Sequence, residues 1–210
     1  MLKSMTRFLL ISVLSVLFFS CKSYQVENAV KKELPASDYK NRYFSNPETD
    51  YVYKAHIEVY GNQLSGIFIA KRMNDTLHRV VFTTDFGNKL LDFELSENDF
   101  KVNYIMEDLD RKMIVNTLRD DFRLLLKTNH EVQEVFESEE YLIYKSADAK
   151  RFNYFYENKK DNKLIKLVNA SKSKEKVIFG FESKNSTFAE HVTIQHKNIK
   201  LKIELNQISN

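Results

Sequence analysis

The chain has 210 residues, of which 43% are hydrophobic, 13% aromatic and 29% charged, and its formal net charge at pH 7 is +3. This length supports one domain with a well-filled core rather than two, and the composition is too apolar for a disordered chain. Basic and acidic residues alternate along the sequence, which argues against a nucleic-acid-binding class that needs clustered Lys and Arg.

The first twenty residues have the layout of a secretory signal peptide. Lys3 and Arg7 precede a run from 8 to 19 that is apolar apart from two serines. This run is too short to cross the ~30 Å hydrocarbon core of a bilayer as a helix, so we expect it to direct export. Removing residues 1–20 leaves 190 residues with 30 basic and 29 acidic side chains, a formal charge of +1.

The end of this segment, Phe18-Phe19-Ser20-Cys21, is similar to a bacterial lipobox. Ordinary signal-peptide cleavage needs small residues before the cut, and Phe18 is too bulky for that pattern. The resemblance implies cleavage before Cys21 and a diacylglyceryl thioether on it, with acyl chains such as palmitate as the membrane anchor. A thioether would also explain why an exported chain has a single cysteine. An incidental cysteine is the alternative.

Residues 21–49 are predicted to be the lipidated N-terminus and a tether. They contain both prolines and little periodicity, with a short helix expected around 26–34, and a loosely coiled chain of this length reaches ~30 Å. Lys22 and Ser23 stand where Asp would suggest inner-membrane retention in the well-studied sorting rule. We therefore expect a lipid-anchored protein of the outer membrane, facing the periplasm, with exposure on the cell surface as the alternative.

From residue 50 onward, short segments alternate apolar and polar side chains, which is typical of half-buried β-strands. Between two groups of such segments, Ile114, Leu118, Phe122 and Leu125 recur at helical spacing. This spacing predicts an amphipathic helix over 109–127, with Asp108 as its N-cap. The first strand is expected to start at residue 51, and the others are expected at 64–72, 77–84, 89–95, 99–106, 132–138, 140–146, 151–157, 163–169, 176–183, 188–196 and 199–207.

Eleven or twelve consecutive strands and one long helix predict a mainly β fold. Short turns such as Gly61-Asn62 and Gly87-Asn88 favour antiparallel neighbours. An open twisted sheet of this size curls, and one helix with an apolar stripe covers or plugs its concave side. We expect residues 50–210 to form a single domain, an incomplete (half) β-barrel with the helix in or over the concave face.

Signals for chemistry are sparse, so we expect a protein that is not an enzyme, with no catalytic residues, no metal site and no cofactor. The sequence has no Gly-x-Ser-x-Gly elbow and no phosphate-cradling loop. Carboxylate pairs such as Asp120-Asp121 are interpreted as solubilising. The five histidines are dispersed and are interpreted as surface or rim residues: His56, His78, His130, His191 and His196.

Apolar side chains on the expected strands and helix form a wall that lines either a packed core or an apolar cavity, and the pattern alone leaves both open. One helix covers less concave surface than a long curled sheet offers, so a lipid-like guest is a reasonable occupant. The expected lining is Phe68, Leu91, Phe93, Phe100, Val102, Tyr104, Leu118 and Phe122.

The order of these parts resembles the LolA/LolB lipoprotein-localisation family, and more its lipid-anchored outer-membrane receptor than its soluble carrier. The turn Thr84-Asp85-Phe86-Gly87 is similar to the receptor's Pro-Leu-Gly loop, in which a protruding leucine accepts the incoming lipoprotein. The resemblance places Phe86 at that leucine and Gly87 at its glycine. Asp85 replaces the proline, and the receptor's tryptophans are absent from this chain.

The resulting hypothesis is a membrane-anchored protein whose half-barrel binds acyl chains of lipids or lipoproteins, with Phe86 and Gly87 as the cargo-contact loop. Its function would lie in lipoprotein localisation to the outer membrane. The alternative is a structural or assembly lipoprotein with a packed core that binds another envelope protein. An open apolar groove of at least ~300 Å³ favours the first, and a filled core with a large exposed patch favours the second.

Overall fold

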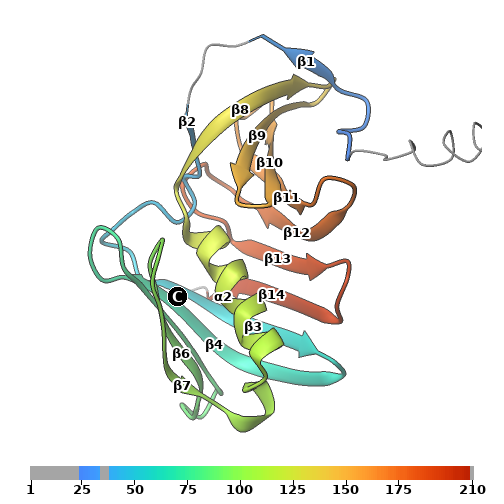
Figure 1. The fold of residues 1–210 in the computed structure, drawn as a ribbon. Helices are drawn as coiled ribbons and strands as arrows, with labels where there is room; N and C mark the ends of the chain where they lie inside the picture. Colours follow the sequence, from blue (N-terminus) through green and yellow to red (C-terminus); the bar gives the residue numbers. More distant parts are fainter. Residues whose placement is uncertain (1–23, 34–37, 209–210) are drawn as a thin grey trace, which may run out of the picture.

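The computed structural model describes residues 24–33 and 38–208, and in this part of the chain the fold is one large antiparallel sheet with one long helix (Figure 1). The helical segments are η1 (Glu107–Leu109) and α2 (Lys112–Leu126). The strands are β1 (Val30–Lys32), β2 (Asp38–Lys40), β3 (Tyr51–Val59), β4 (Asn62–Arg72), β5 (His78–Thr83), β6 (Lys89–Leu95), β7 (Phe100–Ile105), β8 (Asn129–Glu137), β9 (Tyr141–Asp148), β10 (Arg151–Asn158), β11 (Leu164–Ala170), β12 (Glu175–Glu182), β13 (His191–His196) and β14 (Leu201–Gln207).

Two meanders make up the sheet, and the last strand of the chain joins them. The order is β1-β8-β9-β10-β11-β12-β13-β14-β3-β4-β5-β6-β7, and β14 pairs with β3 through the register Ile203 to Ile57. The two ends of this order, β1 and β7, are not paired with each other, so the sheet curls without closing. The predicted half-barrel of antiparallel strands is therefore confirmed.

The helix α2 lies across the concave face of the sheet (Figure 1). Its predicted apolar stripe is confirmed, since Ile114, Leu118, Phe122 and Leu125 are all buried. The predicted start at 109 is wrong, because the chain first turns through η1, where the Asp110 nitrogen donates to the Met106 oxygen at 3.1 Å. Asp108 lies in η1 and therefore does not cap α2.

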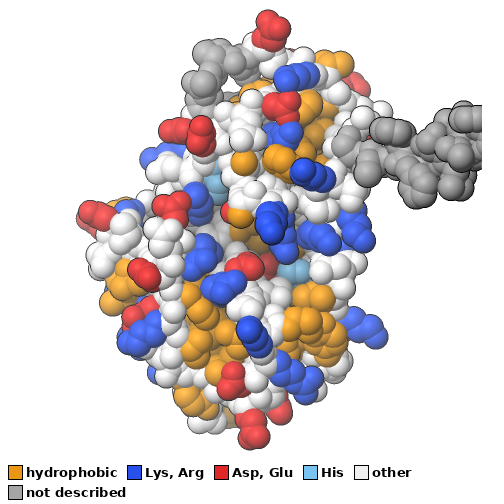
Figure 2. Space-filling model, viewed as in Figure 1, with side chains coloured by type: hydrophobic (Ala, Val, Ile, Leu, Met, Phe, Trp, Pro, Cys, Tyr) orange, Lys and Arg blue, Asp and Glu red, His pale blue; other side chains and the backbone are white. Residues whose placement is uncertain are grey.

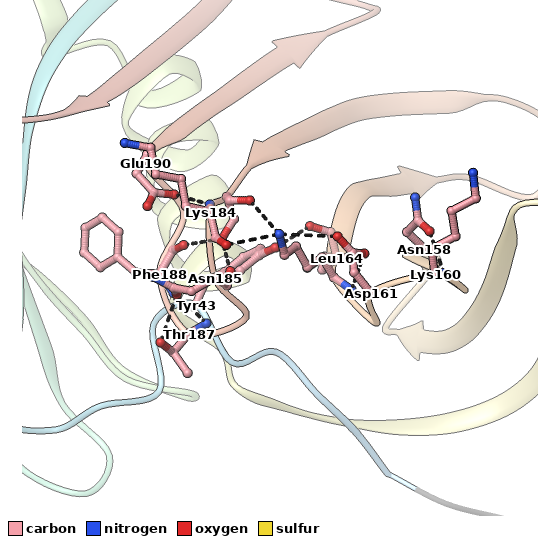
Figure 3. Close-up of polar contacts among 12 residues, drawn as sticks. Tyr43, Asn158, Lys160, Asp161, Leu164, Lys184, Asn185, Thr187, Phe188 and Glu190 are labelled. Carbon is pink, nitrogen blue, oxygen red and sulfur yellow. Dashed lines mark hydrogen bonds and ion pairs between the residues drawn. The ribbon is translucent and has the colours of Figure 1, made fainter.

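The described part of the predicted tether is folded onto the domain. β1 pairs with one end of β8, and β2 pairs with the other through Tyr39 and His130, so neither a tether nor a helix over 26–33 is present there. Tyr43 and Phe44 are buried, and the Tyr43 hydroxyl donates to the Leu164 oxygen at 2.8 Å (Figure 3). Burial of these aromatic rings outweighs the weak local pattern of the segment. Cys21 lies outside the described residues.

The loop between β12 and β13 is held by side-chain contacts beside the Tyr43 bond (Figure 3). The Asn185 side-chain oxygen accepts from the backbone nitrogens of Thr187 and Phe188, both at 2.9 Å. This turn places the Phe188 ring 5.6 Å from the Tyr53 ring. A polar residue thus orders a loop whose apolar side chain seals one end of the core.

Two apolar clusters lie on opposite faces of the sheet. Along β10, Phe155 belongs to the main core under α2, whereas Tyr154 and Tyr156 belong to the second cluster, and alternate residues of a strand point to opposite faces. Tyr24 packs on the second cluster, with its ring 4.9 Å from that of Tyr154. The stretch from Tyr24 to Ala29 therefore covers part of the face that α2 does not, whereas Tyr39, Tyr43 and Phe44 pack on the main core.

Candidate functional site

The space between α2 and the sheet is the first candidate site, and it is filled by side chains. Phe68 of β4 and Phe122 of α2 are fully buried, with ring centroids 5.3 Å apart. Phe93 of β6 meets the partly buried Phe100 of β7 edge to face at 5.1 Å. Of the residues expected to line a cavity, the structure brings six together as a packed core: Phe68, Leu91, Phe93, Phe100, Leu118 and Phe122.

Val102 and Tyr104 do not line this interior, which corrects the prediction. Their side chains are 39% and 45% exposed on β7, which is an edge strand. The pairing of β6 with β7 shifts between Asp92 and Phe93, so one extra residue is inserted in β7. This bulge places Tyr104 opposite Asp92, on the face away from Phe93, whereas Val102 stays opposite Phe93 and is exposed because β7 is the last strand of the sheet. A bulge cannot be read from simple alternation.

The turn between β5 and β6 presents Phe86 to solvent, with 95% of its side chain exposed. The Gly87 nitrogen donates to the Thr84 oxygen at 3.0 Å. Gly87 has a φ of 85°, a backbone conformation that is disfavoured for residues with a Cβ atom. Asp85 forms an ion pair with Lys54 of β3. The expected cargo-contact residues thus lie on a tight turn that holds an apolar ring clear of the domain.

A buried acid and a histidine join α2 to the sheet. The Asp121 Oδ2 of α2 and the His196 Nε2 of β13 are 2.8 Å apart, and both side chains are almost fully buried. Burial raises the pKa of Asp121, and the hydrogen bond from His196 acts in the opposite direction. The interpretation of Asp120-Asp121 as a solubilising pair is wrong for Asp121, as is the surface assignment of His196.

Two further buried polar side chains, Asn153 of β10 and Asn169 of β11, lie on the same face, and the exposed Arg151 contacts Asn169 from the end of β10. The Asn169 Nδ2 donates to the Asn153 Oδ1 at 2.7 Å, and the Arg151 Nη1 donates to the Asn169 Oδ1 at 3.1 Å. None of these three residues was predicted as part of a site. Asp121 was detectable, because it lies three residues after Leu118 on the apolar stripe of the helix, where a solubilising carboxylate has no place.

His130 is also buried, which again corrects its assignment to the surface. Its Nε2 lies 3.1 Å from the Lys127 oxygen, and its ring lies 4.4 Å from that of Phe155. Burial lowers the pKa of His130 to about 4. The imidazole is therefore neutral at neutral pH and acts as a core residue at the start of β8.

The two best-formed cavities of the described residues lie on the face opposite α2. They have volumes of about 600 and 320 Å³ and share Tyr141 and Lys166. The larger opens between the N-terminal segment at Tyr24 and the turn before β9. None of the residues expected to line an acyl-chain cavity borders either one.

Within the described ranges, no group of three or more His, Cys, Asp or Glu side chains is arranged to hold a metal ion. In the same residues, no helix has the length and apolarity to cross a membrane. Figure 2 shows the face that carries α2: Lys and Arg spread over its middle, and hydrophobic side chains gather below, over β7, α2 and β3.

No protein-family model matches the sequence, and neither does any curated protein. Among solved structures, a LolA superfamily protein from Nitrosomonas europaea matches 79% of this chain and 87% of its own, with a TM-score of 0.51 and 8% identity. A candidate outer-membrane lipoprotein-sorting domain from Vibrio parahaemolyticus matches 76% of this chain and 83% of its own, with a TM-score of 0.42 and 9% identity. The first of these likenesses shows that the chain has a LolA-like fold.

Proposed function

We propose that this protein is anchored to the outer membrane through lipid on Cys21 and accepts acyl chains of lipids or lipoproteins between its sheet and α2. The observation that carries the proposal is the continuous apolar surface of the curled sheet, closed by one helix. The LolA-like fold supports it, because the neighbours are a LolA superfamily protein and a candidate lipoprotein-sorting domain. Binding would be hydrophobic, at about 0.8 kcal/mol per buried CH₂, and would need no cofactor or catalytic group.

Because the interior is filled, an acyl chain must displace α2 or its side chains. Polar contacts hold the C-terminal half of the helix: the Arg123 Nη2 donates to the Asp99 oxygen at 3.0 Å, and Lys127 just beyond the helix pairs with Glu97 at 2.7 Å. With the Asp121 to His196 bond, these contacts tie that half to β13 and to the turn between β6 and β7. The N-terminal half is held by packing of Ile114 and Leu118, so it is the half we expect to lift.

Phe86 is proposed as the first contact with acylated cargo, since its ring is fully presented on a turn. The variant Phe86→Glu should accept much less of an acylated lipoprotein than the wild type, because a carboxylate in place of the ring opposes contact with an acyl chain. Transfer is measured from a soluble carrier to the purified protein, and urea unfolding should show unchanged stability. The matched control is Met73→Glu, which changes an exposed apolar residue on the turn between β4 and β5. Equal transfer by Phe86→Glu and the wild type would contradict the role of this turn.

The filled interior also favours a second candidate, an assembly lipoprotein that binds another envelope protein. The edge strand β7 exposes Val102 and Tyr104, and an unpaired strand edge accepts an added strand. Native mass spectrometry of the gently extracted protein separates the two candidates. A bound lipid mass supports acyl-chain binding, whereas a bound protein and no lipid supports the assembly role.

A further inference from the structure

Three hairpin turns at one end of the sheet carry five lysines and no acidic residue. We define them as the basic rim: the turns 149–150, 171–174 and 197–200, with Lys150, Lys172, Lys174, Lys197 and Lys200. They follow β9, β11 and β13, and because consecutive strands are antiparallel these turns lie at the same end. All five lysines are exposed, and none forms an ion pair with the described residues. The residues that immediately flank the turns include Asp148, Arg151 and Glu175 and sum to −1, so the excess belongs to the turns.

The opposite ends of the same strands have a different character. The turns 138–140, 159–163 and 183–190 carry four acidic and four basic residues. Two of these lysines form ion pairs at this opposite end, Lys159 with Glu137 at 2.8 Å and Lys163 with Asp161 at 3.3 Å. Along β9 to β14, positive charge is therefore concentrated at one end of the strands, while the turns 84–88 and 106–111 at the same end of the other meander carry acidic residues, Asp85, Glu107, Asp108 and Asp110.

The N-terminal segment is fixed at the basic rim. The Tyr24 nitrogen donates to the Lys172 oxygen at 2.7 Å, and the Tyr24 hydroxyl donates to Glu175 at 3.2 Å. Cys21 precedes Tyr24 by three residues, and three residues span at most about 11 Å even when fully extended. A lipid on Cys21 would therefore hold this rim close to the bilayer surface.

The neighbouring turn adds apolar side chains to the same end of the sheet. The Tyr60 nitrogen donates to the Lys200 oxygen at 2.9 Å, so the turn between β3 and β4 adjoins the turn 197–200, and both point to one side in Figure 1. Tyr60 is 42% exposed, and its hydroxyl lies 3.7 Å from the sulfur of the exposed Met113. Tyrosine with an apolar neighbour is well suited to the boundary between lipid and water.

We propose that the basic rim docks on the anionic headgroups of the membrane that carries the anchor, and so orients the half-barrel with its mixed-charge turns pointing away. Lysines near an anionic leaflet are attracted over roughly a Debye length, about 10 Å, which matches the reach of the anchor. The docking rests on the lipid anchor of the proposed function. It does not depend on what the interior binds.

The test uses the full lipidated chain in vesicles of phosphatidylcholine mixed with phosphatidylglycerol. Cys21 is the only cysteine and its thiol is consumed by the lipid, so a fluorophore can be placed on Ser173→Cys in the basic rim or on Glu139→Cys at the opposite end. Nitroxide-headgroup lipid should quench the label at 173 and leave the label at 139 unquenched. In vesicles of phosphatidylcholine alone, quenching at 173 should fall to the level that the anchor alone maintains, and quenching at 139 should rise, because the half-barrel is no longer held in one orientation.

Charge variants then show whether residue 173 lies near the bilayer because of the rim lysines or only because of the lipid anchor. Lys197→Gln with Lys200→Gln should lower the ratio of docked to undocked molecules about fivefold for each lysine removed. The matched control, Lys160→Gln with Lys184→Gln at the opposite end, should leave it unchanged. Equal quenching of both labels, or quenching at 173 that ignores lipid charge and the rim lysines, would overturn the proposal.

Mass spectrometry of the N-terminus distinguishes failure of the anchor from failure of the docking. A chain without lipid on Cys21 contradicts the anchor. The docking is then judged with a Cys21→Ser chain tethered to the same vesicles by an N-terminal histidine tag and nickel-chelating lipid, where quenching at 173 that ignores lipid charge overturns it.

Discussion

At the scale of single residues, the contact between Asp121 and His196 is the main polar attachment of α2 to the sheet. Both side chains are buried, so each depends on the other for its hydrogen bond. A buried polar group that loses its partner costs more than the bond itself contributes, because the remaining group stays desolvated. The pair therefore fixes how α2 sits on the sheet more than it adds to net stability.

The first prediction concerns this pair. Asp121→Ala should lower the free energy of unfolding by about 1–3 kcal/mol, because it leaves His196 buried without its acceptor, whereas Asp121→Asn should cost less because the amide oxygen can still accept. Urea unfolding measures both changes. The neighbouring Asp120→Ala is the control, since Asp120 is exposed and pairs only with Arg119. A loss from Asp120→Ala as large as that from Asp121→Ala would contradict the account.

At the scale of secondary-structure elements, α2 decides whether the half-barrel is open or filled. The strands around it supply apolar side chains from both meanders, and Phe122 contacts the Phe68 ring at the centre. The helix is amphipathic, so lifting it from the concave face would expose its apolar stripe, which a bound acyl chain could then cover. Exchange of α2 for an acyl chain is the movement that the proposed function requires.

Phe122→Ala tests this element. The substitution should lower the free energy of unfolding by about 3–5 kcal/mol, because it removes a fully buried ring and leaves a cavity. If the interior accepts acyl chains, the variant should also bind a fluorescent fatty acid more tightly than the wild type, since the void needs less displacement. Met113→Ala, on the exposed side of the same helix, should change neither measurement. Weaker fatty-acid binding by a folded Phe122→Ala protein would argue against the interior as the site.

At the scale of the whole molecule, ion pairs on the outer surfaces make stability depend on pH. Arg79, with help from Lys89, holds the pKa of the buried Asp92 well below its usual range. Lysines lower the pKa of several carboxyls that are more exposed. One of them is Glu137, whose pKa is lowered to about 2 by its hydrogen bond with Lys159. A carboxyl with a lowered pKa stabilises the folded state above its ordinary pKa of about 4, and this contribution is lost as the pH falls toward the folded value. Asp121, whose pKa is raised by burial, acts in the opposite direction.

We therefore expect the free energy of unfolding to fall as the pH is lowered from neutral to about 3. The Asp92→Asn variant should be less stable than the wild type at neutral pH and should show a flatter pH dependence, because it lacks the titrating group. Urea unfolding across this range measures both curves. Glu97→Gln is the control, since Glu97 is largely exposed and its pair with Lys127 is screened by solvent. Parallel curves for the wild type and Asp92→Asn would contradict the role of Asp92.

Much of the fold was predictable because its elements depend on local periodicity. Twelve of the strands and the helix follow alternation or helical spacing, and the half-barrel follows from their number. The candidate site was less predictable. Phe68 and Phe122 were placed together correctly, but the bulge that turns Tyr104 to the other face and the burial of His196 depend on partners outside their own strand or helix.

By itself, the sequence determined the strands, the amphipathic helix and an N-terminus with the features of an exported lipoprotein, because each is encoded within a short window of residues. Only the tertiary structure decided that the interior is filled, that Tyr39 and Tyr43 bind the N-terminal segment to the domain, and that lysines of three separate turns form one rim. These features arise where strands distant in the chain become neighbours, and no local pattern records which neighbours those are.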